Sequence, residues 1–160
     1  MITLIAAIAK NRAIGYKNQL LYHLPDDMRR FRLLTTGHTV IMGRHTFESF
    51  PNGALPNRRN IVLSRSAQAI EGCEVFPSLE AALQHCADEE AIFIIGGSSV
   101  YRSALPYAQQ LILTEVDDLP LEADTFFPPF TGWKEIDREH HAKDERHAVS
   151  FDFVTYQRED

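Results

Sequence analysis

The side chains best suited to acid chemistry in this sequence are Asp26 and Asp27, two adjacent aspartates near the start of a predicted helix. Pro25, just before them, fits the first helical turn, where a missing backbone N–H costs nothing. At about 100° per residue, Asp27 lies on the apolar side of this helix. The same side carries the hydrophobic residues Leu24, Met28, Phe31 and Leu34. The pattern therefore predicts a carboxylate that faces apolar neighbours.

The two aspartates are expected to have different surroundings. Asp26 lies on the polar side, where Arg29 and Arg30 follow at the i+3 and i+4 positions and can pair with it. Asp27 has no basic partner on its own side, so it must find hydrogen-bond donors or take up a proton. One interpretation is an aspartate stabilised by the backbone N–H groups and the macrodipole at the start of the helix. The other is an acid that faces a ligand.

Small and basic residues follow three of the apolar runs that we expect to form strands. They are Gly43, Arg44, His45 and Thr46, then Ser64, Arg65 and Ser66, then Gly96, Gly97, Ser98 and Ser99. Glycine lets a backbone approach a phosphate closely, helix N-termini offer N–H donors, and arginine adds charge-assisted donors. Together on one sheet edge, these segments predict a site for an elongated polyanion such as a dinucleotide. Neither Gly-x-Gly-x-x-Gly nor a Walker loop is present.

Each of these residues has an ordinary interpretation when it is taken alone. A glycine after a strand often marks only a turn, and Arg44 or Arg65 alone is typical of a surface charge. Arg58, just before a predicted strand, fits either a surface position or a fork that holds a ligand carboxylate. Thr114 lies inside an apolar run, where a half-buried strand threonine is common.

The hydrophobic pattern predicts strands that alternate with helices. We expect strands over 2–9, 39–42, 60–63, 74–76, 91–95 and 111–116, and helices from 25, 43, 77 (with Ser78 as N-cap) and 98. The segment 10–23 reads as a long connection, typical of a functional lid. Two alternating runs, 133–138 and 149–157, predict an antiparallel pair. The expected fold is α/β: a mostly parallel central β-sheet with an antiparallel C-terminal edge and flanking helices, in a single domain spanning 1–160.

Composition narrows the classes of function. The 160 residues carry a net charge of −6, which argues against a nucleic-acid or anionic-membrane surface. No apolar run is long enough to span a bilayer, and Met1–Ile5 lacks the basic region of a signal peptide, so we expect a cytoplasmic protein. Cys73 and Cys86 form no close-spaced motif, which favours reduced thiols, although the spacing leaves a disulfide open. The 7 histidines show no ligand spacing, so no metal site is expected.

In this order, the motifs resemble those of dihydrofolate reductases of the bacterial chromosomal type, over essentially the whole chain. The matching stretches are 4–7, 14–15, 24–28 with Phe31, 40–49, 55–56 with Arg58, 60–65, 94–97 with Val100 and Tyr101, 113–114 and 124–128. The resemblance implies NADPH-dependent reduction of 7,8-dihydrofolate to tetrahydrofolate by one small, monomeric domain that antifolates inhibit. It favours the ligand-facing interpretation of Asp27.

The resemblance also assigns residues to the substrate. Asp27 would bind the N3–H and 2-amino group of the pterin, Thr114 would hydrogen-bond to Asp27, and Arg58 would hold the glutamate α-carboxylate. The walls around the pterin and aminobenzoyl rings would be Ile5, Ala6, Met28, Phe31, Phe50, Leu55 and Ile95. In this family the hydride passes from nicotinamide C4 to pterin C6 and N5 gains a proton, and Asp27 is expected to have a pKa raised by desolvation.

The residues implied for NADPH fall into groups. The nicotinamide would be covered by Ala7 and the lid residues Ile14, Gly15, Asn18, Gln19 and Leu20. Phosphates and ribose would contact Gly43, Arg44, His45, Thr46, Leu63, Ser98, Ser99, Val100 and Tyr101. Ser64 and Arg65 would receive the 2′-phosphate, and Gly96–Gly97 would be a cis peptide that joins the two sites.

The sequence departs from the family in three places. Leu21 and Tyr22 stand where Pro-Trp is usual, and we expect the Tyr22 hydroxyl to hold the water that the tryptophan holds. The segment 51–54 carries an extra residue, and Ala123 replaces a frequent glycine. A riboflavin-pathway reductase and an inactive nucleotide-binding module are the alternatives; Asp27 with Arg58 and Thr114 favours a folate enzyme over both.

Overall fold

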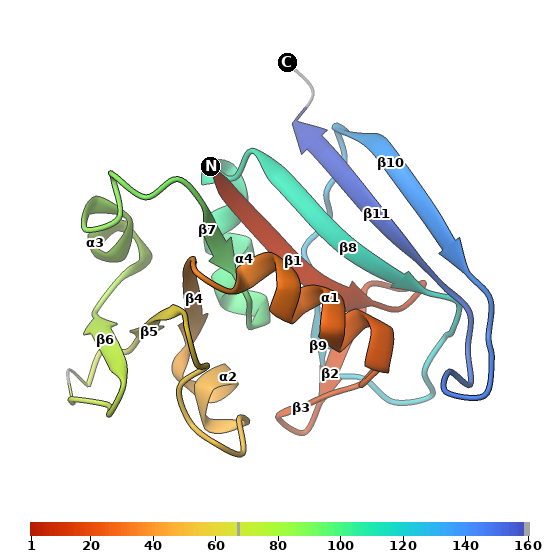
Figure 1. The fold of residues 1–160 in the computed structure, drawn as a ribbon, viewed down its shortest axis with the longest axis horizontal. Helices are drawn as coiled ribbons and strands as arrows, with labels where there is room; N and C mark the ends of the chain where they lie inside the picture. The colour runs from red at the N-terminus through yellow and green to blue at the C-terminus, as the bar shows by residue number, and fades with distance from the viewer. Residues whose placement is uncertain (67, 159–160) are drawn as a thin grey trace.

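The computed structural model describes residues 1–66 and 68–158, and a twisted β-sheet forms its centre (Figure 1). In this part of the chain the sheet has 8 strands in the order β10-β11-β8-β1-β7-β4-β5-β6. Their bounds are β1 Ile2–Ile8, β4 Thr39–Gly43, β5 Arg59–Leu63, β6 Cys73–Phe76, β7 Ile92–Ile94, β8 Gln110–Val116, β10 Trp133–His141 and β11 Phe151–Arg158. The strands from β8 to β6 pair in parallel, whereas β11 pairs antiparallel with β8 and with β10. The predicted α/β fold with an antiparallel C-terminal edge is confirmed.

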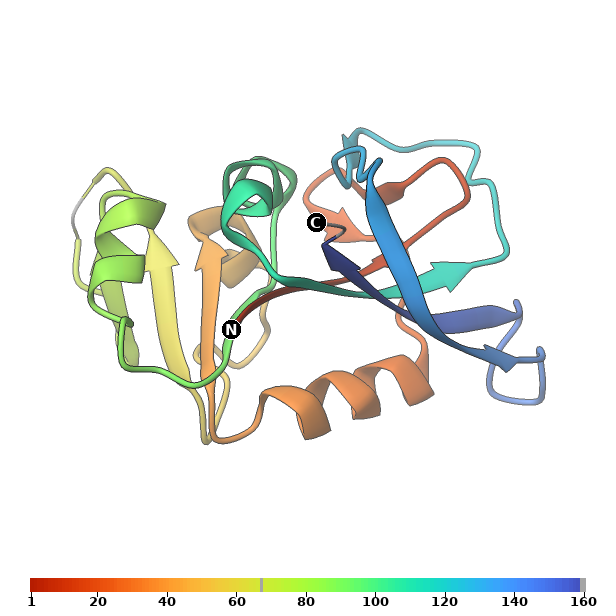
Figure 2. The same ribbon diagram turned by 90° about the horizontal axis from the view of Figure 1, so that it is seen from above.

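Helices lie on both faces of the sheet. They are α1 Pro25–Thr35, α2 Arg44–Glu48, α3 Leu79–Gln84 and α4 Ser98–Ala104, followed by the 3₁₀ turn η1 Leu105–Tyr107. Figures 1 and 2 show α1 on one side of β1 and α4 on the other. The predicted N-cap of α3 is confirmed, because the Ser78 hydroxyl accepts the Ala81 N–H at 3.1 Å.

Side-chain alternation along the parallel strands sends neighbouring residues to different clusters on the two faces of the sheet. Leu4 and Ile41 point toward α3 and α4, where they join Tyr101 and Ala104. The next residues along these strands point to the α1 face, which carries Ile5, Leu34, Val40, Met42, Phe47, Phe50, Leu55, Val62, Phe93 and Ile95. Because successive residues of a strand face opposite sides, one apolar run covers both clusters. The continuous apolar runs of the sequence are explained in this way.

The segment 10–23, expected to be a long connection, contributes two strands to a second, smaller sheet. This sheet consists of β3 Gln19–Leu20, β2 Ala13–Tyr16 and β9 Thr125–Phe126, in that order. Lys17 and Asn18 have φ values of 50° and 63°, as a two-residue hairpin turn requires. A Cβ on Gly15 would lie 2.6 Å from Thr125 Oγ1, so glycine permits β2 to approach β9. β9, the other partner of β2, is far along the chain, and β3 has only 2 residues, so local pattern did not predict this sheet.

The C-terminal hairpin also differs from its predicted bounds. β10 continues to His141, and β11 begins only at Phe151. The register pairs His141 with Phe151, so the length of β10 follows its partner strand rather than its own mostly exposed side chains. The loop between the two strands therefore spans residues 142–150.

Candidate active site

Asp27 and Thr114 meet across the α1 face of the sheet. Asp27 comes from the first turn of α1, and Thr114 lies near the end of β8 and is buried. The Thr114 hydroxyl donates a short hydrogen bond to Asp27 Oδ1. Thr114 is the register partner of Ala7 on β1 and of Phe153 on β11. The structure thus brings the predicted acid and the predicted strand threonine into direct contact.

The surroundings of Asp27 favour its protonated form. Burial raises the pKa of this carboxyl group above its ordinary value, because desolvation destabilises the charge. The Thr114 hydrogen bond and the positive charge of Arg30 act against this shift and lower the pKa by a smaller amount. Desolvation dominates, so Asp27 is a carboxyl group with a raised pKa, as expected from the sequence.

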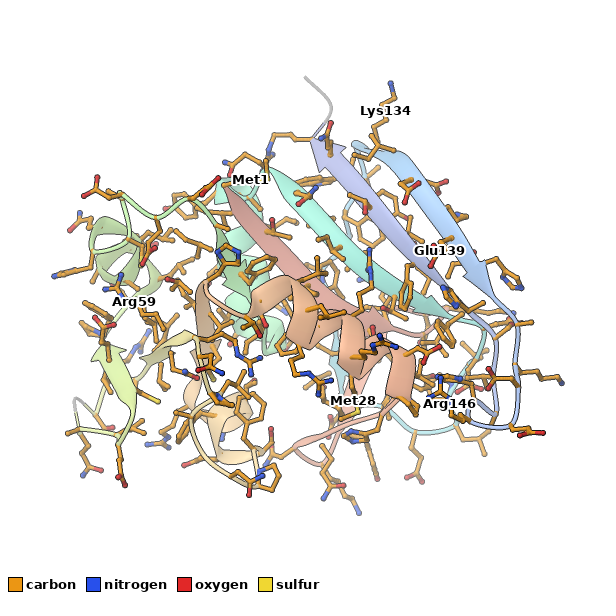
Figure 3. The ribbon with its side chains drawn as sticks, in the orientation of Figure 1. Met1, Met28, Arg59, Lys134, Glu139 and Arg146 are labelled. Carbon is orange, nitrogen blue, oxygen red and sulfur yellow. The ribbon has the colours of Figure 1, made fainter. Side chains whose placement is uncertain are left out.

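The expected pairing of Asp26 with Arg29 and Arg30 is wrong. Asp26 Oδ1 forms an ion pair with Arg146 Nη2 at 2.5 Å, from the loop between β10 and β11. Figure 3 shows Arg146 beside the first turn of α1. Arg30 instead lies over the ring of Phe153, 4.4 Å from its centroid, next to the strand pair that carries Thr114. Arg30 is three residues after Asp27 and belongs to its side of the helix, a spacing that could have identified it.

The α1 face of the sheet also carries the predicted apolar side chains. Ile5, Phe50, Leu55 and Ile95 are partly buried and pack against one buried cluster. Met28, on α1, is 54% exposed, so its side chain forms a rim rather than part of the core. Ala6 differs from the other predicted wall residues, since its side chain packs against the cluster on the opposite face. Only the backbone of Ala6 therefore belongs to this face.

Arg58 is held in place near the far end of this apolar region. Its Nη1 donates to Thr35 Oγ1 at 3.1 Å and its Nε donates to the Pro56 carbonyl at 2.9 Å. Its guanidinium carbon lies 6.0 Å from the centroid of the Phe31 ring. Burial and the nearby Arg32 lower the pKa of Arg58. These two bonds leave the Nη2 group to donate to a carboxylate.

The carboxyl ends of β4 and β7 lie side by side and carry the predicted glycines. The Gly43 N–H donates to the Gly96 carbonyl at 2.9 Å, and the Gly96–Gly97 peptide is cis, as the resemblance implied. Gly96 has a φ of +132°, and a Cβ there would lie 3.2 Å from Thr46 Oγ1. A Cβ on Gly43 would lie equally close to Val100 Cγ2, at 3.2 Å. Glycine at both positions therefore permits a close packing at this edge that a larger residue would disturb.

Three further groups of predicted cofactor residues lie around these glycines. Arg44 and His45 are exposed and face Glu48, at 3.6 Å and 3.5 Å. At the end of β5, next to Leu63, Ser64 Oγ lies 2.8 Å from Ser66 Oγ, and Arg65 is exposed. At the start of α4, Ser98 is partly exposed and Ser99 exposed. Tyr101 is buried, and its hydroxyl donates to the Ile5 carbonyl at 2.7 Å. This bond holds β1 from the side of the sheet that α4 covers.

Some of the predicted lid residues are buried in the structure, and the others are exposed to solvent. Ile14 and Gly15 are buried in β2, whereas Asn18, Gln19 and Leu20 are exposed at the hairpin tip. Ala7, at the end of β1, is partly buried. The exposed tip is the part of this segment that is able to approach a ligand.

Tyr22 has a partner that sequence reasoning missed. Its hydroxyl donates to Asp118 Oδ2 at 2.8 Å, in the loop between β8 and β9. Burial raises the pKa of Tyr22, and the hydrogen bond to Asp118 raises it further. Because the one hydroxyl proton is used by Asp118, a water at Tyr22 would have to donate to the phenol oxygen. No local signal identifies Asp118, which is 96 residues away along the chain.

Within residues 1–66 and 68–158, no three His, Cys, Asp or Glu side chains are grouped so that they could hold a metal ion. None of the helices described here combines the length and the hydropathy that crossing a bilayer requires.

Comparison with known proteins agrees with this geometry. A family model described as dihydrofolate reductase matches residues 1–158. The chain is 46% identical to dihydrofolate reductase type 3 of Salmonella typhimurium, over 99% of both chains. It is 47% identical to a dihydrofolate reductase of Neisseria meningitidis serogroup A, over 98% of both. A solved dihydrofolate reductase from Enterococcus faecalis, complexed with NADP(H) and RAB-propyl, superposes with a TM-score of 0.92 at 33% identity, over 100% of this chain and 97% of that one.

The Thr114 hydrogen bond can be tested by the substitution Thr114→Val. Valine keeps the shape of threonine but donates no hydrogen bond, so the pKa of Asp27 should rise further. An NMR titration of the aspartate side-chain carbons measures this change. Thr39→Val is the matched control, because Thr39 is also a buried strand threonine whose hydroxyl bonds a carboxylate, that of Glu89 at 2.9 Å. Equal titration of Asp27 in wild type and Thr114→Val would contradict the assigned bond.

The raised pKa of Asp27 also predicts a stability effect of Asp27→Asn. Between the ordinary aspartate pKa and the raised one, the folded protein binds more protons than the unfolded chain, so the free energy of unfolding falls as pH rises through this window. Asparagine does not ionise, so the variant does not lose this free energy of unfolding as pH rises. The variant should therefore have a higher Tm than wild type at neutral pH, with the difference vanishing in acid below the ordinary aspartate pKa. A lower Tm at neutral pH would show that the carboxylate is stabilised by its site.

Proposed function

The chain belongs to the dihydrofolate reductase family of oxidoreductases, and we propose that it reduces 7,8-dihydrofolate to 5,6,7,8-tetrahydrofolate with NADPH. The observation that carries the proposal is the contact between Asp27 and Thr114 within an otherwise apolar face. A sequestered carboxylate needs donors, and the N3–H and 2-amino group of a pterin provide two parallel ones. The side-chain hydrogen bond to this carboxyl group comes from Thr114 on β8.

The residues at the sheet edge fit a dinucleotide. Glycine at 43 and 96 lets the ends of β4 and β7 pack closely against Val100 and Thr46, because a Cβ at either position would meet one of these side chains at 3.2 Å. Arg44, Arg65 and the serines 64, 98 and 99 bring cationic and hydroxyl donors to the same edge. This donor set suits phosphates, and the Enterococcus faecalis relative was solved with NADP(H). When bound, NADPH supplies the hydride that pterin C6 receives.

Asp27 and its neighbours orient the pterin and control its protonation. The carboxyl group pairs with N3–H and the 2-amino group, while Thr114 holds Oδ1 in place. Ile5, Phe50 and Ile95 exclude water from the ring faces and so strengthen these bonds. A carboxyl group with a raised pKa near the ring favours the pterin that has gained a proton at N5. The chief contribution of the chain is alignment within a dry site.

Arg58 and Phe31 extend the site toward the substrate tail. Arg58 Nη2 would hold the glutamate α-carboxylate, because the bonds to Thr35 and Pro56 fix the guanidinium plane. Phe31, Met28 and Leu55 would contact the aminobenzoyl ring. We propose further that the single domain 1–160 is a cytoplasmic monomer. Its partners are then the small-molecule substrate and antifolate inhibitors, with no nucleic-acid or membrane partner.

The first test measures oxidation of NADPH in the presence of dihydrofolate, for the wild type and for Asp27→Asn. Asp27→Asn should lose about 10²-fold or more in kcat near neutral pH and recover part of it in acid, where the substrate is already protonated. Asp26→Asn is the matched control, because this adjacent side chain points to Arg146 at the surface, and its activity should stay close to wild type.

Two outcomes would contradict this proposal. One is folded wild-type protein that consumes no NADPH with dihydrofolate. The other is an Asp27→Asn variant with an unimpaired rate that does not change with pH, since the carboxyl group would then have no part in the reaction.

Cofactor selection is tested by Arg65→Ala. If Arg65 receives the 2′-phosphate, the ratio of kcat/KM for NADPH to that for NADH should fall roughly tenfold or more, since a charge-assisted hydrogen bond is lost. Arg102→Ala is the control, because Arg102 is also exposed but lies in the last turn of α4, away from the cofactor edge. An unchanged cofactor ratio in Arg65→Ala would reject this role.

A further inference from the structure

The helix that carries Asp27 lacks an N-terminal cap of its own. Its N-cap residue is Leu24, whose side chain accepts no hydrogen bond, and Pro25 at the first helical position has no N–H. The first intrahelical bond runs from the Met28 N–H to the Leu24 carbonyl, at 2.9 Å. The N–H groups of Asp26 and Asp27 therefore need acceptors from outside the helix.

The side chain of His147 provides one of these acceptors. The Asp26 N–H donates to His147 Nε2 at 3.3 Å, although the two residues are 121 positions apart. Because Nε2 accepts, the ring proton is on Nδ1, where it donates to Asp144 Oδ1 at 2.9 Å. The His147 side chain is 1% exposed, so solvent does not replace either contact. A neutral imidazole thus caps α1 in a single tautomer.

The loop between β10 and β11 is built around this histidine. Asp144 Oδ1 also accepts the N–H groups of Arg146 and His147, each at 2.9 Å, and the Asp144 N–H bonds the His147 carbonyl at 2.9 Å. The imidazole packs against Phe151, with 5.0 Å between the ring centroids. Phe151 and Leu24 belong to the same buried cluster, which ties the loop to the start of α1.

We propose that His147 is a positioning residue for Asp27: it caps α1 from the C-terminal hairpin and so fixes the carboxyl group against Thr114. The inference rests on the proposed function, because it assigns Asp27 to the pterin. Asp27 follows Asp26 directly, and both lie in the first helical turn, so a displacement of the capped N–H moves the carboxyl group. The Arg146–Asp26 ion pair is a weaker anchor, because the Arg146 side chain is 64% exposed.

The experiment compares His147→Leu, which removes the acceptor, with His147→Gln, whose side-chain oxygen reaches the place of Nε2. In His147→Leu, kcat/KM for dihydrofolate should fall about tenfold, with KM for NADPH unchanged. The pH profile of kcat should also move to higher pH, because the Thr114 bond that lowers the pKa of Asp27 is weakened. His147→Gln should restore most of both effects.

Two controls separate positioning from general destabilisation. His140→Leu removes an exposed histidine of the same hairpin that contacts Asp152 rather than α1, and it should leave both readouts unchanged. Thermal unfolding is measured for every variant. His147→Leu with a lowered Tm but an unaltered pH profile and an unaltered KM for dihydrofolate would overturn the proposal and leave His147 a purely structural role.

A measurement on the wild-type protein keeps the proposal testable if His147→Leu does not fold. Nitrogen-15 NMR of labelled histidine should show that His147 carries its proton on Nδ1, and hydrogen exchange should show a protected Asp26 amide. A proton on Nε2 would overturn the proposal, because Nε2 could not then accept. This measurement needs no substrate, so a failure of the proposed reaction is distinguished from a failure of the cap.

Discussion

The desolvation of the Asp27 carboxyl group is the constraint on which the rest of the site depends. Burial beneath α1 raises its pKa, and the Thr114 hydroxyl together with the Arg30 charge offsets only part of this cost. Such a group lowers the stability of the folded protein at neutral pH and is retained where a ligand supplies the missing donors. The apolar residues on this face exclude water, and each polar contact between the carboxyl group and a ligand is therefore stronger. The site therefore selects a ligand with hydrogen-bond donors, because the desolvated carboxyl group is unfavourable without one.

The topology of the sheet explains why this acid lies next to the edge that we propose binds the dinucleotide. Parallel strands bring their carboxyl ends to one side, so Ala7, Gly43 and Gly96 become neighbours although they are distant in sequence. Strand alternation then directs Ile5 and Thr114 to the α1 face and leaves the opposite face for Tyr101, which supports β1 through the Ile5 carbonyl. In the function proposed above, the dinucleotide and the substrate would meet at this edge, where ligands of α/β sheets collect.

The position of α1 depends on partners from the C-terminal half of the chain. Its first turn is capped by His147 and paired through Asp26 with Arg146, and both partners come from one loop between β10 and β11. The connection that precedes α1 is held in a similar way, because Tyr22 donates to Asp118 after β8. The antiparallel edge thus does more than extend the sheet: it fixes the helix that presents the acid.

The sequence by itself determined the α/β class, the strands of the parallel sheet and the residue types of the site, because hydrophobic period, turn chemistry and local motifs act over a few residues. It also identified Asp27 and Thr114 separately. Only the tertiary structure decided their contact, which spans 87 positions, the pairing of Asp26 across 120, and the cap across 121. It likewise corrected the predicted pairing of Arg30 with Asp26, and it placed two strands within the connection 10–23. Such contacts depend on how strands are ordered and how a helix is docked, and no local pattern encodes a partner that lies that far along the chain.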